Sequence, residues 1–270
     1  PTWWSKNHEE LTQVSCAILL EGARLHLIAS HLTLARRCLS LAQKHLGIHI
    51  ELTGIEGVRT KFQKRAIAQL VLLLSRDKNN NSEEKTRTTT TTTSLNIRNV
   101  RIEDLDEDTH LLEHANLNNA PETATGRLGV IEQQLLLLRA EILGKSRAME
   151  STLIEQMRAH VERVFVQPES YTIQITALLM RSRLEIAKSR TRERALLQLQ
   201  TIVDDLRGNV VVVDDSKKKE QQKYASTHQR FRNFHGTPLR PLWEIRKELA
   251  GYYLGTGMVK TASSIFEDLE

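Results

Sequence analysis

The stretch PLWEIRKELAGYYLGTGMVKTASSIFEDLE, residues 241–270, decides the fold class that we predict for this chain. Its small residues Ala250 and Ala262 are spaced so that two antiparallel helices can approach closely, and Gly257 permits a tight turn between them. Tyr253 and Phe266 are large enough to fill the space between the helices. The pattern therefore predicts a helical hairpin with six packing positions: Leu249, Ala250, Tyr253, Gly257, Ala262 and Phe266.

These positions follow the pattern of the tetratricopeptide repeat (TPR), a helical hairpin of about 34 residues with the consensus W-x2-L-G-x2-Y, A-x3-F and P. Leu249-Ala250-x2-Tyr253 and Ala262-x3-Phe266 occur in that order. Two positions depart from the pattern, because Arg246 replaces the Trp and the closing Pro would lie after Glu270. We predict one TPR-like hairpin here; the alternative is an ordinary amphipathic helix pair.

The composition also favours helices. Aromatic residues make up 4% of the 270 residues and there are five prolines, while Leu, Ala, Arg, Glu and Gln are abundant, which argues against a β-sandwich or barrel.

The net charge of +5 suits an acidic partner but is too small to indicate RNA binding by itself. Two cysteines indicate no disulfide framework, and no apolar run approaches 18 residues, so we expect no membrane contact. We expect the protein in the cytoplasm, with the nucleus as a second location.

Helical periodicity predicts another hairpin at the start of the chain, over residues 8–30 and up to Leu46, with Gly47 ending the second helix. Ala23 and Ala35 are spaced like Ala250 and Ala262. Leu39 takes the position of Phe266. The apolar faces expected for the two helices contain Leu11, Val14, Ile18, Leu25 and Ile28 in the first, and Leu34, Cys38, Leu41 and Ala42 in the second.

Between these hairpins the pattern changes twice. In the connector ELTGIEGVRTKFQ, residues 51–63, two glycines break helical periodicity, and a helix is expected from there to Ser75, with Phe62, Ala66, Leu70, Leu73 and Leu74 facing inward. Residues 77–126 contain an Asn run, six consecutive threonines and an acidic run, a composition that predicts disorder. Further helices are expected over 128–143, 146–165, 170–189, 191–207 and 214–233.

The predicted organisation is therefore a hairpin, connector and helix over residues 1–76, a disordered low-complexity insertion over 77–126, helical hairpins over 127–236 and the first TPR-like hairpin over 237–270. Single hairpins cannot bury their apolar faces alone, so they stack side by side. The predicted fold class is all-α, with hairpins stacked as a TPR-like α-solenoid.

Three blocks of this sequence resemble the tetratricopeptide repeat protein 27 family and its fungal cell-wall-maintenance relatives. One block runs from Thr172 to Ala195, and another joins Trp243-x-Ile245-x3-Glu248-Leu249-Ala250 to Ile265-Phe266-Glu267. The family's main repeat array would follow Glu270. The third block is the connector, whose matching positions are Glu51, Leu52, Thr53, Gly54, Gly57, Arg59, Thr60, Phe62 and Gln63.

The resemblance implies an all-helical protein without enzymatic activity. It also implies a role in complex assembly, including spliceosomal ribonucleoprotein biogenesis with chaperone machinery, or, in fungi, in cell-wall integrity. We expect a scaffold that binds other proteins through its concave surface and through exposed connector residues such as Arg59, Lys61 and Arg65.

Three motifs with possible chemistry are weak. His110-Leu-Leu-Glu-His114 matches the H-x-x-E-H zinc-protease motif, but that motif needs a rigid helix and a third ligand. The stretch GTGMVKT, residues 255–261, lacks the Gly directly before Lys that a P-loop needs. Lys247 could grip a terminal carboxylate, but Gly251 stands where such a clamp has Asn. We therefore expect no metal, no cofactor, no small-molecule substrate and no catalytic residue.

The alternative function is an RNA- or ribonucleoprotein-binding helical module, which the sequence favours less. The stretch HQRFRNFH, residues 228–235, interleaves aromatic and basic residues, as single-strand binders do. The candidate basic face for this function comprises Arg181, Arg183, Lys188, Arg190, Arg192 and Arg194.

Overall fold

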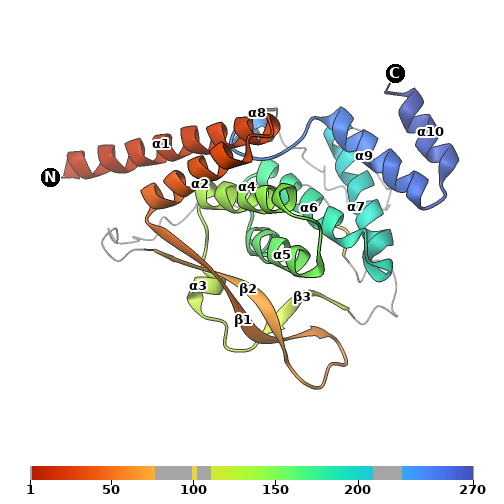
Figure 1. Ribbon diagram of the computed structural model, residues 1–270, viewed down its shortest axis with the longest axis horizontal. Coiled ribbons are helices and arrows are strands. Elements are labelled where there is room, and N and C mark those ends of the chain that lie inside the picture. Colours follow the sequence, from red (N-terminus) through yellow and green to blue (C-terminus); the bar gives the residue numbers. More distant parts are fainter. Residues whose placement is uncertain (1, 77–98, 102–110, 209–226, 270) are drawn as a thin grey trace, which may run out of the picture.

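The computed structural model describes residues 2–76, 99–101, 111–208 and 227–269 (Figure 1). Four helical hairpins follow one another in this part of the chain. They are α1 (Thr2–Ile28) with α2 (Leu32–Leu46), α4 (Val130–Ser146) with α5 (Ser151–Phe165), α6 (Tyr171–Glu185) with α7 (Ser189–Arg207), and α9 (Leu242–Gly255) with α10 (Val259–Glu267).

Each hairpin packs on the next. Helices α1 and α2 both contact α4, α5 contacts α6, and α7 contacts α9. This serial stacking confirms the predicted helical, TPR-like solenoid. Figure 1 shows the first hairpin at one end of the series and α10 at the other.

Local sequence sets the ends of these helices. Gly47 and Gly208 follow α2 and α7 with φ of 60° and 76°, the left-handed conformation that closes a helix and favours glycine. At the start of α6, the Ser170 side chain accepts a hydrogen bond from the Ile173 N–H at 3.4 Å. The predicted hairpin over 170–207 is therefore present, with its turn at residues 186–188.

Helix α6 is the centre of the molecule because it belongs to both clusters of the apolar core. Ile173 and Ala177 pack with α1, α2, α4, α5 and the sheet. Ile175 and Leu178 pack with α7, α9 and α10. All four side chains are fully buried, so α6 joins the two halves of the solenoid.

The structure contains a small antiparallel sheet, which corrects the expected helix up to Ser75. Strand β1 (Ile48–Thr60) lies between β2 (Ile67–Arg76) and β3 (Leu111–Leu117), and Leu52 pairs with Leu72. The reason lies in an alternation of period two: Ile48, Ile50 and Leu52 alternate with polar residues, and they pack against the core together with Leu70, Leu72 and Leu74. Phe62 and Ala66, expected to face inward, lie in the turn, and Phe62 is 72% exposed.

Part of the insertion predicted to be disordered is ordered. Strand β3 and the short helix α3 (Glu122–Thr125) lie within residues 77–126. The apolar stretch at 111–117 gains backbone partners from β1, which offsets the entropy lost on ordering. Residues 77–98, with the threonine run, and 102–110, with most of the acidic run and His110, lie outside the described residues, as does most of the helix expected over 214–233; its end forms α8 (Thr227–Phe231).

The first hairpin forms as predicted but buries different side chains. Leu11, Val14, Ile18, Leu25 and Ile28 are between 57% and 66% exposed, so the face expected for the core of α1 is wrong. The buried side chains of α1 are Cys16, Leu20, Ala23 and Leu27, and those of α2 are Ala35, Leu39 and Ala42. Helix α1 carries two apolar stripes, and the stripe with the smaller side chains allows α1 and α2 to approach closely.

Gly57 should be essential to the sheet, because it pairs with β2 on one side and with β3 on the other. A Cβ at Gly57 would lie 2.9 Å from the Asn116 carbonyl oxygen, whereas a Cβ at Gly54 would meet only Ala68 Cβ at 3.7 Å. Gly57→Ala should therefore lower the free energy of unfolding by about 1–3 kcal/mol. Urea unfolding measures this, with Gly54→Ala as the control; equal effects of the two substitutions would contradict the packing described here.

His160 on α5 is a buried imidazole. Its side chain is 1% exposed, and Nδ1 lies 2.8 Å from the Gln156 carbonyl oxygen. Burial lowers the pKa of His160 from its usual 6.5 to about 4; the hydrogen bond to Gln156 opposes this shift and the charge of Arg139 adds to it. The imidazole is therefore neutral in the folded protein at pH 7.

This pKa predicts a loss of stability in acid. Between about pH 6.5 and pH 4 the unfolded chain binds a proton at His160 and the folded chain does not, so the free energy of unfolding falls as the pH falls through this window. The loss attributable to His160 should reach about 3 kcal/mol at most. Urea unfolding at several pH values measures it, and His160→Gln should show a smaller loss; the same pH dependence in both proteins would refute the assignment.

Candidate interaction surface

The terminal hairpin brings five of the six predicted TPR packing positions into one apolar cluster, and the sixth, Gly257, lies in the turn. Gly257, between α9 and α10, has φ of 83°, the left-handed conformation that the turn requires. Phe266 is half-buried and packs against the same cluster as Tyr253. The buried positions are Leu249, Ala250, Tyr253 and Ala262, and both alanines are fully buried.

Polar contacts attach this hairpin to the one before it. The Tyr253 hydroxyl donates to Gln200 Oε1 on α7 at 3.0 Å. Arg183 on α6 donates two hydrogen bonds of 2.6 Å to the Glu248 carboxylate on α9, which also accepts from the Tyr252 hydroxyl at 3.1 Å. Burial and the negative charge of Glu248 raise the pKa of Tyr252 to about 12, so this hydroxyl remains a donor at neutral pH.

One segment, residues 230–240, crosses the first helices of the three preceding hairpins, and we call it the crossing segment. Each of those helices donates hydrogen bonds from a side chain to the segment's backbone carbonyls. Thr172 Oγ1 of α6 lies 2.9 Å and 2.7 Å from the carbonyl oxygens of residues 230 and 232, and Gln134 Nε2 of α4 lies 2.9 Å from that of Asn233. Figure 1 shows this segment passing from α8, beside the end of α1, to α9.

Arg24 of α1 donates more hydrogen bonds to the crossing segment than Gln134 or Thr172 does. Its guanidinium donates to the carbonyl oxygens of Phe234 at 2.9 Å, His235 at 3.4 Å and Leu239 at 3.1 Å, and it lies 4.3 Å from the centroid of the Phe234 ring. Burial lowers the pKa of Arg24, while the charge of Glu21 opposes this shift. Sequence reasoning missed Arg24, Gln134 and Thr172. Gln134 could have been recognised from the sequence, because a glutamine that directly precedes four leucines needs polar partners when the helix is buried.

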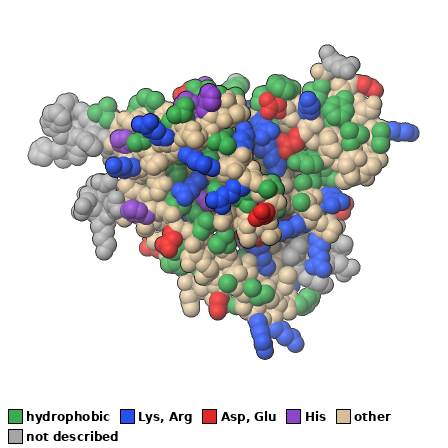
Figure 2. Space-filling view, viewed as in Figure 1, with side chains coloured by type: hydrophobic (Ala, Val, Ile, Leu, Met, Phe, Trp, Pro, Cys, Tyr) green, Lys and Arg blue, Asp and Glu red, His purple; other side chains and the backbone are tan. Residues whose placement is uncertain are grey.

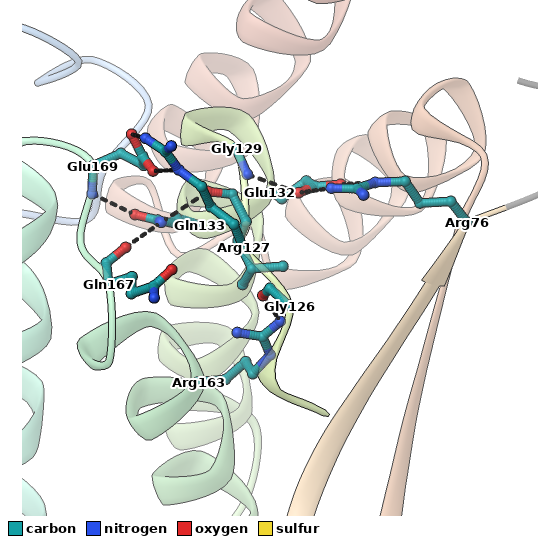
Figure 3. Close-up of polar contacts among 10 residues, drawn as sticks. Arg76, Gly126, Arg127, Gly129, Glu132, Gln133, Arg163, Gln167 and Glu169 are labelled. Atoms are coloured by element: carbon teal, nitrogen blue, oxygen red, sulfur yellow. Dashed lines mark hydrogen bonds and ion pairs between the residues drawn. The ribbon is translucent and has the colours of Figure 1, made fainter. Parts of the chain in front are cut away.

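A second polar network joins the two ends of the insertion (Figure 3). Arg76, at the end of β2, donates to both oxygens of Glu132 on α4 at 3.0 Å, and Glu132 accepts from the Gly129 N–H at 2.8 Å. The same carboxylate therefore caps α4 and holds the strand that leads into the insertion.

Gln133 continues this network to the turn between α5 and α6. Its amide donates to the Gln167 carbonyl oxygen at 2.7 Å and accepts from the Glu169 N–H at 3.0 Å. Glu169 in turn pairs with Arg127 at 2.7 Å, and Arg163 donates to the Gly126 carbonyl oxygen. Figure 3 shows these side chains converging at the start of α4, so this network fixes the chain where it returns from the insertion.

The candidate basic face is not a face. Arg181 and Arg194 are buried, and both contact the buried Glu185, while Arg183 is paired with Glu248. The six residues span the end of α6, a turn and the start of α7, so their side chains point in different directions. Arg190 and Arg192 are exposed, and Lys188 pairs with Glu155 at 3.4 Å.

The connector positions lie mainly in β1. Glu51, Leu52, Thr53, Gly54, Gly57, Arg59 and Thr60 belong to the strand, and Phe62 and Gln63 follow in the turn to β2. Gln63 orders this turn through hydrogen bonds with the Arg59 N–H and the Gly57 and Arg65 carbonyls. Of the residues expected to bind partners, Arg59 pairs with Glu155 at 3.5 Å, whereas Lys61 and Arg65 are exposed.

The three weak motifs lie in different parts of the fold. In the H-x-x-E-H motif, His110 lies outside the described residues, and the following residues up to His114 lie in strand β3. Among the described residues, no group of three His, Cys, Asp or Glu side chains is close enough to hold a metal ion. Residues 255–261 form the turn between α9 and α10, and Lys247 is exposed on α9.

Helix α1 contains one segment, Glu10–Ile28, that is long and apolar enough to cross a membrane by length and composition. One such helix is weak evidence for a membrane span, because the core helices of soluble proteins can be equally long and apolar. The expectation of no membrane contact therefore remains a prediction.

The chain is similar to curated TPR proteins. It is 29% identical over 264 residues to a TPR repeat-containing protein of Schizosaccharomyces pombe, which covers 88% of this chain and 32% of the relative. It is 28% identical to the tetratricopeptide repeat protein 27 homologue of Dictyostelium discoideum, over 81% of this chain and 24% of the relative. It is 25% identical to the Essential for maintenance of the cell wall protein 1 of Saccharomyces cerevisiae, over 97% of this chain and 33% of the relative.

These similarities confirm the resemblance to TPR proteins that include the protein 27 homologue and the fungal cell-wall-maintenance protein. No family model matches the chain, and no solved structure matches it. The chain spans between a quarter and a third of the length of these three relatives. The comparisons support a repeat-type scaffold for protein–protein interaction.

The contacts of Arg24 predict a large contribution to stability. Arg24→Met should remove three hydrogen bonds to the carbonyl oxygens of the crossing segment and lower the free energy of unfolding by about 2–4 kcal/mol. Arg36→Met is the matched control, because Arg36 is exposed on the neighbouring helix, and it should change stability by less than about 0.5 kcal/mol. Urea unfolding measures both, and faster trypsin cleavage at Arg230 or Arg232 should accompany the loss in the Arg24 variant. Equal stability of the two variants would show that the segment is held by other contacts.

Proposed function

We propose that this chain is a non-enzymatic portion of a TPR-type scaffold that holds partner proteins during the assembly of a larger complex. The observation that carries this proposal is the serial stacking of four hairpins in the described residues, together with the similarity to TPR proteins. Stacked hairpins present a long, rigid surface for other proteins, and the described residues contain no reactive site. Complementary surface contacts, not bond chemistry, would then do the work.

The crossing segment limits where partners bind. It occupies the side of the solenoid formed by α1, α4 and α6, so less of that side is free for a partner protein. Trp243 on α9, which is 57% exposed, and the turn between β1 and β2 lie away from this segment and stay exposed. We therefore place partner contacts at these two regions.

The turn between β1 and β2 suits an acidic partner. Lys61, Lys64 and Arg65 are all exposed and form no ion pair with another described residue, and Phe62 between them is 72% exposed. Figure 2 shows Lys and Arg side chains projecting from this end of the sheet. An exposed aromatic ring among cations is a suitable anchor for an acidic segment with an apolar residue.

The assembly is proposed from the relatives alone. By resemblance, the process is ribonucleoprotein biogenesis with chaperones or, in fungi, the maintenance of cell-wall integrity. The proposed location is the cytoplasm, with the nucleus as a second location. Direct RNA binding is not favoured, because three of the six basic residues that suggested it are already paired with buried carboxylates.

The proposal predicts partner loss on charge reversal at the turn. In the variant Lys61→Glu, Lys64→Glu, Arg65→Glu, the amount of some of the proteins that copurify with the tagged chain should fall at least tenfold. The reason is that charges at the rim of an interface control association. Quantitative mass spectrometry of the copurified proteins measures this. Arg36→Glu, Arg147→Glu is the control, because both arginines are exposed elsewhere, on α2 and after α4.

Two results would contradict the scaffold. One is that the wild-type chain, the charge-reversed variant and Trp243→Ala all copurify with the same set of partner proteins. The other is binding of single-stranded RNA in filter assays, with a salt slope of about −0.7 per neutralised phosphate, which would favour the RNA-binding alternative.

A further inference from the structure

The first hairpin has an exposed apolar face that no other described part of the chain covers. On α1, Leu11, Ile18 and Leu25 are 66%, 65% and 60% exposed, and on α2, Leu34 and Leu41 are 43% and 41% exposed. We call these five residues the outer face. Single exposed leucines are common, but a contiguous set on two adjacent helices marks an interaction site.

The spacing and the register of the two helices bring these residues together. Within each helix the residues are seven apart, so they lie on one side of it. Between the helices, Cys16 Sγ lies 3.8 Å from the Ala42 carbonyl oxygen, and a Cβ at Gly22 would lie 3.8 Å from Cys38 Sγ. This antiparallel register sets Ile18 level with Leu41 and Leu25 level with Leu34.

The outer face points away from the rest of the solenoid. Helix α4 packs on the opposite side of the hairpin, where Gln43 of α2 accepts a hydrogen bond from Arg139 of α4 at 3.2 Å. Between the two rows of the outer face lie Gly22, which has no side chain, and Cys38, whose side chain is small. Another helix can therefore approach closely.

The two long edges of the outer face carry charges of opposite sign. Glu21 lies at the edge of α1, with its side chain 50% exposed and 3.7 Å from His235. Arg37 lies at the far edge of α2, exposed, and makes no ion pair with the described residues. The face is therefore acidic along one edge, apolar in the middle and basic along the other edge. Figure 2 shows apolar and basic side chains side by side over this hairpin.

We infer that the outer face is a dimer interface between two copies of this chain, related by a two-fold axis parallel to the helices. This rotation lays α1 on the other copy's α2 at the same level. Ile18 then meets the partner's Leu41, Leu25 meets the partner's Leu34, and Glu21 comes within reach of the partner's Arg37. Symmetry repeats each contact, so one face supplies both halves of the match.

The other in-plane axis gives a poorer match. An axis perpendicular to the helices would set α1 against α1, with the two acidic edges on the same side. Like charges across an interface oppose association, while the parallel axis sets the acidic edge on the basic one. The charge pattern therefore selects a second copy in one orientation.

The size of the outer face sets the expected affinity. Helix α2 has 15 residues and is about 22 Å long. Two adjacent helices are roughly 20 Å wide, so each copy contributes a face of about 450 Å². Specific interfaces usually bury about 600–1,000 Å² per partner, so this face is smaller than a standard interface and suits a weak association. We expect a reversible dimer with a dissociation constant in the micromolar range.

Sedimentation velocity of the 270-residue chain tests the dimer. From about 1 to 100 μM the wild-type chain should change from monomer to dimer. Ile18→Glu, Leu41→Glu should remain monomeric at every concentration, with an unchanged circular dichroism spectrum because both side chains are exposed. Val166→Glu is the control, since Val166 is 57% exposed at the end of α5, and this variant should dimerise like the wild type.

Charge reversal tests the orientation. Glu21→Arg and Arg37→Glu should each weaken the dimer by up to about tenfold, since each removes two symmetric ion pairs. The double variant Glu21→Arg, Arg37→Glu should restore it, because the charges are then exchanged between the two copies. A double variant that is weaker than either single variant would overturn the proposed orientation.

Three other results would overturn the dimer itself. The first is a monomer at all concentrations. The second is binding to phosphatidylserine vesicles that Ile18→Glu abolishes while the chain in solution stays monomeric, which would assign the face to a membrane. The third is a dimer that survives Ile18→Glu, Leu41→Glu but is lost in Val259→Glu, which would place self-association at α10.

Discussion

The hydrogen bonds between the crossing segment and three helices hold this solenoid together as one unit. Hairpins in a repeat protein usually contact only their neighbours. Here Arg24, near the start of the chain, donates to the carbonyl of Leu239, 215 residues later, and Gln134 and Thr172 donate to the same segment. These side chains donate to backbone carbonyl oxygens that lie mostly outside helices and strands, and Leu239 among these residues is buried. The early hairpins are therefore expected to unfold together.

The second constraint lies at the base of the insertion. The chain leaves the sheet at Arg76 and returns to the helices near Gly129, and Glu132 binds both. Closing a loop at its base makes its length and composition matter little for the rest of the fold, because the entropic cost grows slowly with length. Strand β2, which leads into the insertion, packs on α5, and strand β3 of the insertion joins the same sheet. The insertion therefore adds ordered structure next to its base.

The charged residues of this chain mostly serve the fold. Arg183 binds Glu248, and Arg181 and Arg194 share Glu185, which fixes α6 against α7 and α9. Partly buried ion pairs of this kind orient helices more than they add stability. The surface of the described residues also carries three apolar or cationic regions: the outer face of the first hairpin, Trp243 on α9 and the cations around Phe62. These are features of a protein that binds other proteins.

The sequence by itself determined the hairpins and their turns, because short-range sterics decide them. Gly47, Gly208 and Gly257 all adopt positive φ where helices end, and Ala250 and Ala262 are buried where two helices cross. Only the tertiary structure decided the rest. Helix α1 has two apolar stripes, and packing against α2 and α4 selected the one with small side chains. Residues 67–76 became a strand because β1 supplied backbone partners, and the basic residues of α6 and α7 were buried because Glu185 and Glu248 neutralise them. These choices depend on residues distant in the sequence, which local patterns do not contain.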